Sequence, residues 1–173
     1  MNRKDFTLSQ IQKYPEGYWR AIFPLFVKFG DKIRVGSGVI FSQGFGYEKI
    51  NNEWVHIPHS GRIIIEDKVE IWDGTNICRG TADNDSTIIG VGTKIDYNVH
   101  IAHNVKIGKH CLIIAGSIIG GSAVVGDHCY LGIGCMIKNK IKIGNNVTIG
   151  MGAVVIKDVP DNVTVIGNPA RAL

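Results

Sequence analysis

An aliphatic side chain recurs at every sixth residue through the second half of this 173-residue chain, and this period constrains the fold more than any other feature. The step of six begins at Ile89, is occupied twelve times without a break and ends at Val155. The members between these two are Ile95, Ile101, Ile107, Ile113, Ile119, Val125, Leu131, Ile137, Ile143 and Ile149. The same phase extends back through Ile77, Ile71 and Ile65, and it fails at Asp83.

Small and turn-forming residues occupy fixed places within each six-residue unit. The residue after the aliphatic is usually Gly or Ala, and Asn or Gly recurs two places later, as at Asn98 and Gly116. One inward aliphatic in six is too sparse for an alternating strand and has the wrong period for a helix. It fits a short strand followed by a tight turn, since Gly and Asn tolerate positive φ. The pattern therefore predicts an all-β fold, a parallel β-helix of hexapeptide repeats.

Three such units close a triangular coil, so residues 18 apart should stack on neighbouring coils. Cys111 and Cys129 have this spacing at a second inward position, which favours both as core residues. The chain has no CxxC pair and its N-terminal stretch is too polar for an export signal, so we expect all four cysteines to be reduced, Cys78 and Cys135 included.

Departures from the period suggest a division of the chain. Residues 1–30 are aperiodic and rich in aromatics, and we expect an N-terminal cap there, with a short helix near Leu8–Tyr14. The β-helix should occupy residues 31–160, with polar loops at 46–60 and 79–87, and residues 161–173 should form a C-terminal cap. Polar loops that leave a rigid scaffold commonly carry binding groups.

Composition excludes several classes of function. No apolar run approaches the ~18 residues of a membrane span, and we expect a cytoplasmic protein without membrane insertion. The net charge of +4 is mild and lacks a Lys/Arg block of the kind that binds nucleic acid. It favours an anionic small-molecule ligand.

The strongest candidate for chemistry is His103, two residues after Ile101 and therefore at a coil corner. The 18-residue spacing predicts Gly121, Asn139 and Lys157 on the same ridge. The imidazole could accept a proton from a nucleophile, and the Gly121 N–H could bind an oxyanion. A thioester arm could follow the ridge to Lys157. We expect a second ridge of Gly116, Gly134 and Gly152 one position over, which would leave room for that arm.

Other interpretations of these histidines remain open from the residues alone. His103 could be a solvated or hydrogen-bonded surface histidine. His110 and His128 also stack at a spacing of 18, and we expect both to face solvent.

Residues 44–125 resemble a known family. The matching elements are GFGY (44–47), Trp54, Ile57-Pro58, Gly61-Arg62, the VEI…RG run, IDxN and AHNVxIG. They are similar to the UDP-3-O-acylglucosamine N-acyltransferases of lipid A synthesis. The resemblance implies a left-handed β-helix, His103 as the general base, Gly121 as the oxyanion contact and Asp96 as a supporting residue.

The chain also departs from this family in three places. The 30-odd residues before the repeat are too few for the uridine-binding domain, and Asn139-Lys140 stands where the family has a second histidine. The C-terminal stretch IGMGAVVIKDVPDNVTVIGNPARAL resembles the cap of acetyl-CoA-dependent sugar and serine acetyltransferases. This second resemblance implies acetyl-CoA as donor, with Gly134, Asn139, Gly152 and Lys157 along its path.

Side chains of the polar loops are candidate acceptor contacts. Tyr47 and Trp54 could stack on a base or sugar, Arg62 or Arg79 could pair with a phosphate, and Asp85 lies in the same loops. For each of them a purely structural role is an equally open interpretation.

These observations predict a homotrimeric N-acetyltransferase that uses acetyl-CoA, needs no metal and acts on the amino sugar of a nucleotide-linked sugar. The first alternative is the lipid A enzyme itself, with acyl carrier protein as donor. A γ-carbonic-anhydrase-like zinc enzyme is disfavoured, because the spacings of His100, His103 and His110 put no two rings on one ridge. A non-catalytic scaffold is the last alternative.

Overall fold

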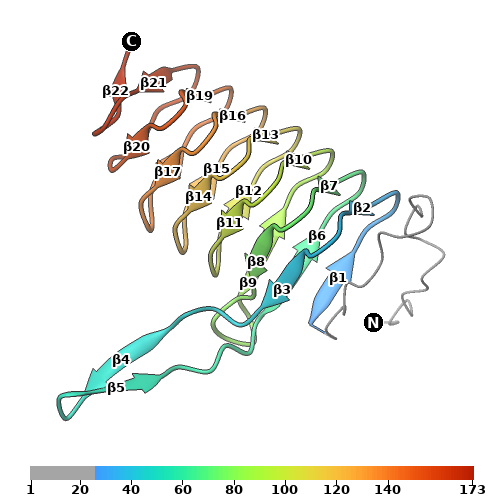
Figure 1. Cartoon of the computed structure of the whole chain (residues 1–173), viewed down its shortest axis with the longest axis vertical. Coiled ribbons are helices and arrows are strands. Elements are labelled where there is room, and N and C mark those ends of the chain that lie inside the picture. Colours follow the sequence, from blue (N-terminus) through green and yellow to red (C-terminus); the bar gives the residue numbers. More distant parts are fainter. Residues whose placement is uncertain (1–25) are drawn as a thin grey trace.

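The computed structural model describes residues 26–173, which form a stack of short strands with three flat sides and one projecting arm (Figure 1). The expected short helix and most of the expected N-terminal cap lie outside these residues. The stack is a left-handed parallel β-helix, as the repeat and the resemblance predict.

Each side of the stack is one sheet with a strand from every coil. The first sheet contains β1 (Val27–Phe29), β6 (Arg62–Ile65), β9 (Ser86–Ile89), β12 (Lys106–Ile107), β15 (Val124–Val125) and β18 (Lys142–Ile143). The second contains β2 (Arg34–Val35), β7 (Glu70–Ile71), β10 (Lys94–Ile95), β13 (Leu112–Ile113), β16 (Tyr130–Leu131), β19 (Thr148–Ile149), β21 (Thr164–Ile166) and β22 (Arg171–Ala172). The third contains β3 (Ile40–Ser42), β8 (Asn76–Cys78), β11 (His100–Ile101), β14 (Ile118–Ile119), β17 (Met136–Ile137) and β20 (Val154–Val155).

The corners between the sheets are two-residue turns whose second residue has positive φ. Most of these residues are Asn or Gly, such as Asn98 (φ 54°) and Gly116 (φ 70°), as the repeat predicts. His110 (φ 54°) and His128 (φ 57°) occupy the same turn position. This conformation is strained for most side chains, which is why Asn and Gly prevail at the corners.

The interior is filled by the aliphatic ladder. Ile95, Ile101, Ile113 and Ile119 are fully buried, and each stacks on its equivalent in the next coil. The four cysteines are buried and free, as expected. Since each coil covers the next, the ladder alone explains why the chain folds into a continuous prism.

The ends of the prism differ from the expected boundaries. β1 already pairs with β6 in parallel, so the coil includes residues before the expected start at residue 31. At the other end β21 pairs in parallel with β19, and β22 folds back antiparallel on β21. The segment expected to be a cap therefore continues the second sheet. No helix able to span a membrane occurs in residues 26–173.

Both large excursions leave the prism at the corner between the third and first sheets. The first joins β3 to β6 and contains the hairpin of β4 (Tyr47–Ile50) and β5 (Glu53–His56), which projects from the prism (Figure 1). The second joins β8 to β9 over residues 79–85, because Ser86 and Thr87 already belong to β9. The same corner carries His103, between β11 and β12, so every insertion gathers at the candidate site.

Candidate functional site

The third–first corner forms a ridge in which His103, Gly121, Asn139 and Lys157 follow one another coil by coil. Each lies two residues after a third-sheet core residue, and these core residues pair in register: Ile101 with Ile119, Ile119 with Ile137, and Ile137 with Val155. Backbone bonds join the turns directly, since Ser122 N–H donates to the His103 carbonyl (2.8 Å) and Lys140 N–H to that of Gly121 (2.9 Å). We call this line the His103 ridge.

The imidazole of His103 lies against Gly121. A Cβ added at Gly121 would come within 2.6 Å of His103 Nε2 and 2.7 Å of its Cε1. Glycine is therefore required at position 121 by the close approach of the ring, since its φ is not in the positive range. The arrangement puts a proton acceptor, Nε2, beside a bare stretch of backbone.

The Gly121 N–H differs in its hydrogen bonding from the equivalent groups at another corner. At another corner, Lys109 N–H donates to Asp127 Oδ1 (2.7 Å) and Asp127 N–H to Asn145 Oδ1 (2.8 Å), one coil further on. On the His103 ridge the equivalent oxygen is Asn139 Oδ1, which lies beside Gly120. Within residues 26–173, however, the Gly121 N–H makes no hydrogen bond.

A second histidine, which the sequence did not single out, adjoins His103. The ring of His59 lies 5.2 Å from that of His103, centroid to centroid, at an interplanar angle of 68°. His59 is only 3% exposed, and its Nδ1 accepts a hydrogen bond from Gly44 N–H (2.9 Å). Burial lowers the pKa of His59, and the positive charges of His103, His56 and Arg79 add to this effect.

Arg79 anchors the segment that carries His59. It follows β8 as His103 follows β11, so it lies one coil before His103 on the ridge. Its Nε donates to Gly61 O (2.7 Å), its Nη2 to Ser60 O (2.6 Å), and its guanidinium lies 4.1 Å from the centroid of the Phe26 ring. These contacts occupy the guanidinium of Arg79, which the sequence suggested as a partner for phosphate.

Asp85 and Asn104 tie the second excursion to the His103 turn. Asn104 accepts from Thr81 N–H (2.9 Å) and donates to Thr81 Oγ1 (2.8 Å), which itself donates to Asp85 Oδ2 (2.6 Å). The Thr81 hydroxyl, Ala82 N–H and Asn104 amide bonds lower the pKa of Asp85. The carboxylate that we expected to contact substrate thus holds the loop beside the site.

Asp96, which the resemblance suggested as a supporting residue, lies away from His103 within the chain. It precedes β11, whereas His103 follows it, so the two residues lie at different corners. Asp96 accepts from Tyr97 N–H (2.8 Å) and Ala115 N–H (3.1 Å) and holds the second–third corner.

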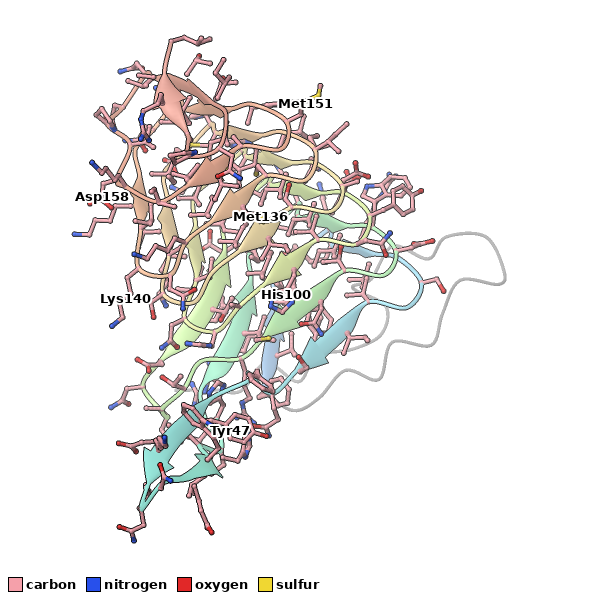
Figure 2. The ribbon with its side chains drawn as sticks, turned by 60° about the vertical axis from the view of Figure 1, so that its left-hand side comes forward. Tyr47, His100, Met136, Lys140, Met151 and Asp158 are labelled. Atoms are coloured by element: carbon pink, nitrogen blue, oxygen red, sulfur yellow. The ribbon has the colours of Figure 1, made fainter. Side chains whose placement is uncertain are left out.

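The glycine ridge also lies at the second–third corner rather than one position from His103. Gly116, Gly134 and Gly152 are turn residues that join the second sheet to the third. Figure 2 shows the separation, because Lys140 and Met151 lie at opposite edges of the third sheet. An arm that contacted both Lys157 and Gly152 would have to cross this sheet. Lys138, Lys140 and Lys157 are exposed beside the His103 ridge and make no ion pair within residues 26–173.

The expected acceptor contacts of the hairpin are exposed and lie outside the His103 ridge. Tyr47 is 43% and Trp54 69% exposed, and Tyr47 packs against His56 (Figure 2). Arg62 begins β6 with its side chain exposed. His110 and His128 stack on each other at 5.3 Å and face solvent, as expected. No group of three metal-binding side chains occurs among the residues described.

The fold and the ridge define a hexapeptide-repeat β-helix with an imidazole at one corner. Residues 122–157 match the sequence model of the bacterial transferase hexapeptide family (six repeats).

Similar proteins are acyltransferases. UDP-3-O-acylglucosamine N-acyltransferase of Caulobacter vibrioides is 52% identical over 149 residues, which cover 86% of this chain and 43% of that protein. The protein of the same name from Agrobacterium fabrum is 46% identical over 94 residues, or 54% of this chain and 26% of that protein. This chain thus spans less than half the length of these relatives.

Solved structures agree in fold. LpxA from Acinetobacter baumannii superposes with a TM-score of 0.76 at 27% identity, covering 86% of this chain and 55% of that one. Together these comparisons confirm the resemblance to the hexapeptide-repeat acyltransferases that the sequence indicated.

Proposed function

We propose that this chain carries the acyl-transfer site of an N-acyltransferase acting on the amino sugar of a nucleotide-linked sugar. The observation that carries this proposal is the approach of His103 Nε2 to the bare backbone of Gly121. The C. vibrioides relative, whose name states N-acyl transfer to UDP-3-O-acylglucosamine, is similar over residues that include this corner.

The chemistry assigned to the two residues is complementary. As the amine nitrogen forms a bond to the thioester carbonyl carbon, His103 Nε2 takes the proton that the nitrogen must lose. The Gly121 N–H donates to the oxygen on which negative charge develops. When the carbon–sulfur bond breaks, the imidazolium returns its proton to the departing sulfur. His103 therefore ends the cycle in its starting form.

We propose acetyl-CoA as the donor, on the resemblance of residues 149–173 to acetyl-CoA-dependent enzymes. The ridge beyond Gly121 suits an anionic donor, because Lys138, Lys140 and Lys157 are unpaired among the described residues. Charge alone does not select acetyl-CoA, since acyl carrier protein is also acidic. The 52% identity to an N-acyltransferase of UDP-3-O-acylglucosamine favours acyl carrier protein as the second candidate. Thermal shifts with acetyl-CoA and with acyl carrier protein carrying its acyl group distinguish the two donors.

We further propose a cytoplasmic homotrimer in which a neighbouring subunit completes the site. His103 lies at an outer corner, so a single chain would line a binding site beside it on one side only. The third sheet, which ends at that corner, carries exposed apolar side chains at Ile118 (42%) and Met136 (46%). Ile133 (55%) and Met151 (77%) extend this patch over the second–third corner (Figure 2). A subunit packed on this patch would face the His103 ridge.

The test of the proposed function is the His103→Ala variant. We expect it to fold and assemble as the parent does and to lose most acyl transfer, with a kcat lower by about 100-fold or more. The assay uses UDP-3-O-acylglucosamine or its amino-sugar analogues with each donor. Full activity of this variant would overturn the assignment of His103.

A further inference from the structure

His59 is placed beside the general base by contacts from several segments. Its backbone N–H donates to Gln43 Oε1 (3.2 Å), its Nδ1 accepts from Gly44 N–H, and Arg79 holds the carbonyls of Ser60 and Gly61 directly after it. The segment from 43 to 61 has nineteen residues and is mostly exposed, but these contacts hold the His59 ring in a buried position. Such anchoring exceeds what closing a loop requires.

Three glycines make room for the two rings. A Cβ at Gly44 would overlap Cε1 and Nδ1 of His59 and would lie 3.3 Å from Cβ of His103. A Cβ at Gly46 would lie 2.7 Å from His59 Nε2, and one at Gly121 would meet Nε2 of His103. None of the three has positive φ, so the space, rather than the backbone conformation, excludes side chains here.

The contacts of His59 favour a single protonation state. Because Nδ1 accepts a hydrogen bond, the neutral ring carries its proton on Nε2. A second proton on Nδ1 would break the bond from Gly44 and would bury a charge close to Arg79, His56 and His103. Among the described residues, these three are the titratable groups whose charges act on the ring. These contacts favour His59 as a neutral imidazole next to the half-buried ring of His103.

We propose that His59 is a positioning residue of the acyl-transfer site, an imidazole that holds the ring of His103 against Gly121. The inference rests on the proposed function of His103. The edge contact at 5.2 Å restricts the movement of the His103 ring, while Gly121 leaves the space that the ring occupies. Among the described residues, His59 is the imidazole that packs against the ring of His103.

The test separates this role from simple anchoring of the loop. In His59→Asn, Oδ1 takes the place of Nδ1 and keeps the bond from Gly44 N–H, but the outer half of the ring is lost. We expect an unchanged unfolding midpoint and substrate KM, and a kcat lower by about 10-fold or more, because small displacements of a base are costly. His59→Gln, which restores an amide at the position of Nε2, should regain part of this loss. A kcat equal to that of the parent in His59→Asn would overturn the inference.

A measurement without turnover tests the same point. In ¹⁵N NMR spectra of the full chain, the neutral His59 ring should show the Nε2–H form, and its pKa should lie below the ordinary value of 6.5. The His103 ring signals should shift in His59→Asn. Ordinary titration of His59 near pH 6.5, or unchanged His103 signals, would contradict the inference. If His103→Ala retains full activity, the proposed function fails and these spectra alone decide the placement of His59.

Discussion

At the scale of single residues, the site depends on the absence of a side chain at Gly121 as much as on the imidazoles. Gly121 leaves its N–H uncommitted within the described residues and leaves space for His103 Nε2. The two properties need the same residue for different reasons: the hydrogen bond needs an open approach, and the ring needs the volume of the missing Cβ. A replacement that is mild elsewhere in the coil should therefore be severe here.

Gly121→Ala should lower kcat by about 10-fold or more, because the added Cβ meets the His103 ring at 2.6 Å and displaces it. Steady-state kinetics with the better donor measure the effect. Gly38→Ala is the matched control: it lies at the other corner, φ is +66°, and a Cβ there meets only Gly74 N at 3.9 Å. It should cost about 1 kcal/mol of stability from backbone strain and leave kcat unchanged. Equal kcat for Gly121→Ala and the parent would show that the ring does not work in this position.

At the scale of elements, two imidazoles make the stability of the fold depend on pH. One lies on strand β11 and the other at the base of the hairpin. Burial lowers the pKa of His100, which projects from β11, and of His59, which closes the first excursion. In the unfolded chain both groups return to the ordinary value of 6.5. The unfolded state therefore binds more protons as the pH falls below about 6.5, and the folded state loses stability there.

We expect the free energy of unfolding to fall between pH 6.5 and pH 5. For each group the slope should be less than the roughly 1.4 kcal/mol per pH unit of one fully linked proton. His100→Gln should flatten the profile, since it removes one of the two buried groups. His128→Gln, at an exposed corner, removes no buried imidazole and provides the control. Urea unfolding at several pH values gives the measurement, and a profile that rises toward pH 5 would contradict the sign.

At the scale of the whole molecule, the prism presents a flat, apolar third sheet and an arm that has no packing of its own. All eight hairpin residues of β4 and β5 are exposed, although Ile50 and Val55 are among them. A two-stranded hairpin is marginal in water unless something packs on it. Asn51 (φ 50°) and Asn52 (φ 70°) supply the turn, which fits the twist of a short hairpin but adds no buried surface. These features are expected of a subunit that is covered by another.

Replacing Ile133 and Met136 together by Glu should convert the proposed trimer into monomers, because two charges would have to be buried in the subunit contact. Sedimentation velocity reports the mass, and acyl transfer should fall with assembly. Val124→Glu places one charge on the first sheet, where Val124 is 38% exposed, and should leave the trimer intact. A double variant that remains trimeric would place the contact on another face.

The sequence by itself determined the coil. Because the ladder is strictly periodic from Ile89 to Val155, counting in steps of 18 was enough to put His103, Gly121, Asn139 and Lys157 on one ridge. The same counting was wrong for Gly134 and Gly152, which the repeat placed next to the His103 ridge. They lie at the second–third corner, because each six-residue unit carries the chain across a whole sheet.

Only the tertiary structure decided what the insertions bring to the ridge. Where loops interrupt the coil, the spacing between paired residues changes: Phe41 pairs with Ile77, 36 residues on (77 − 41), and Ile77 with Ile101, 24 residues on (101 − 77). No period then predicts where a side chain inside the loop will lie. His59 reaches His103 because its N–H donates to Gln43 Oε1, its Nδ1 accepts from Gly44 N–H, and Arg79 anchors the segment that follows it. These contacts exist only once both excursions have folded onto the same corner.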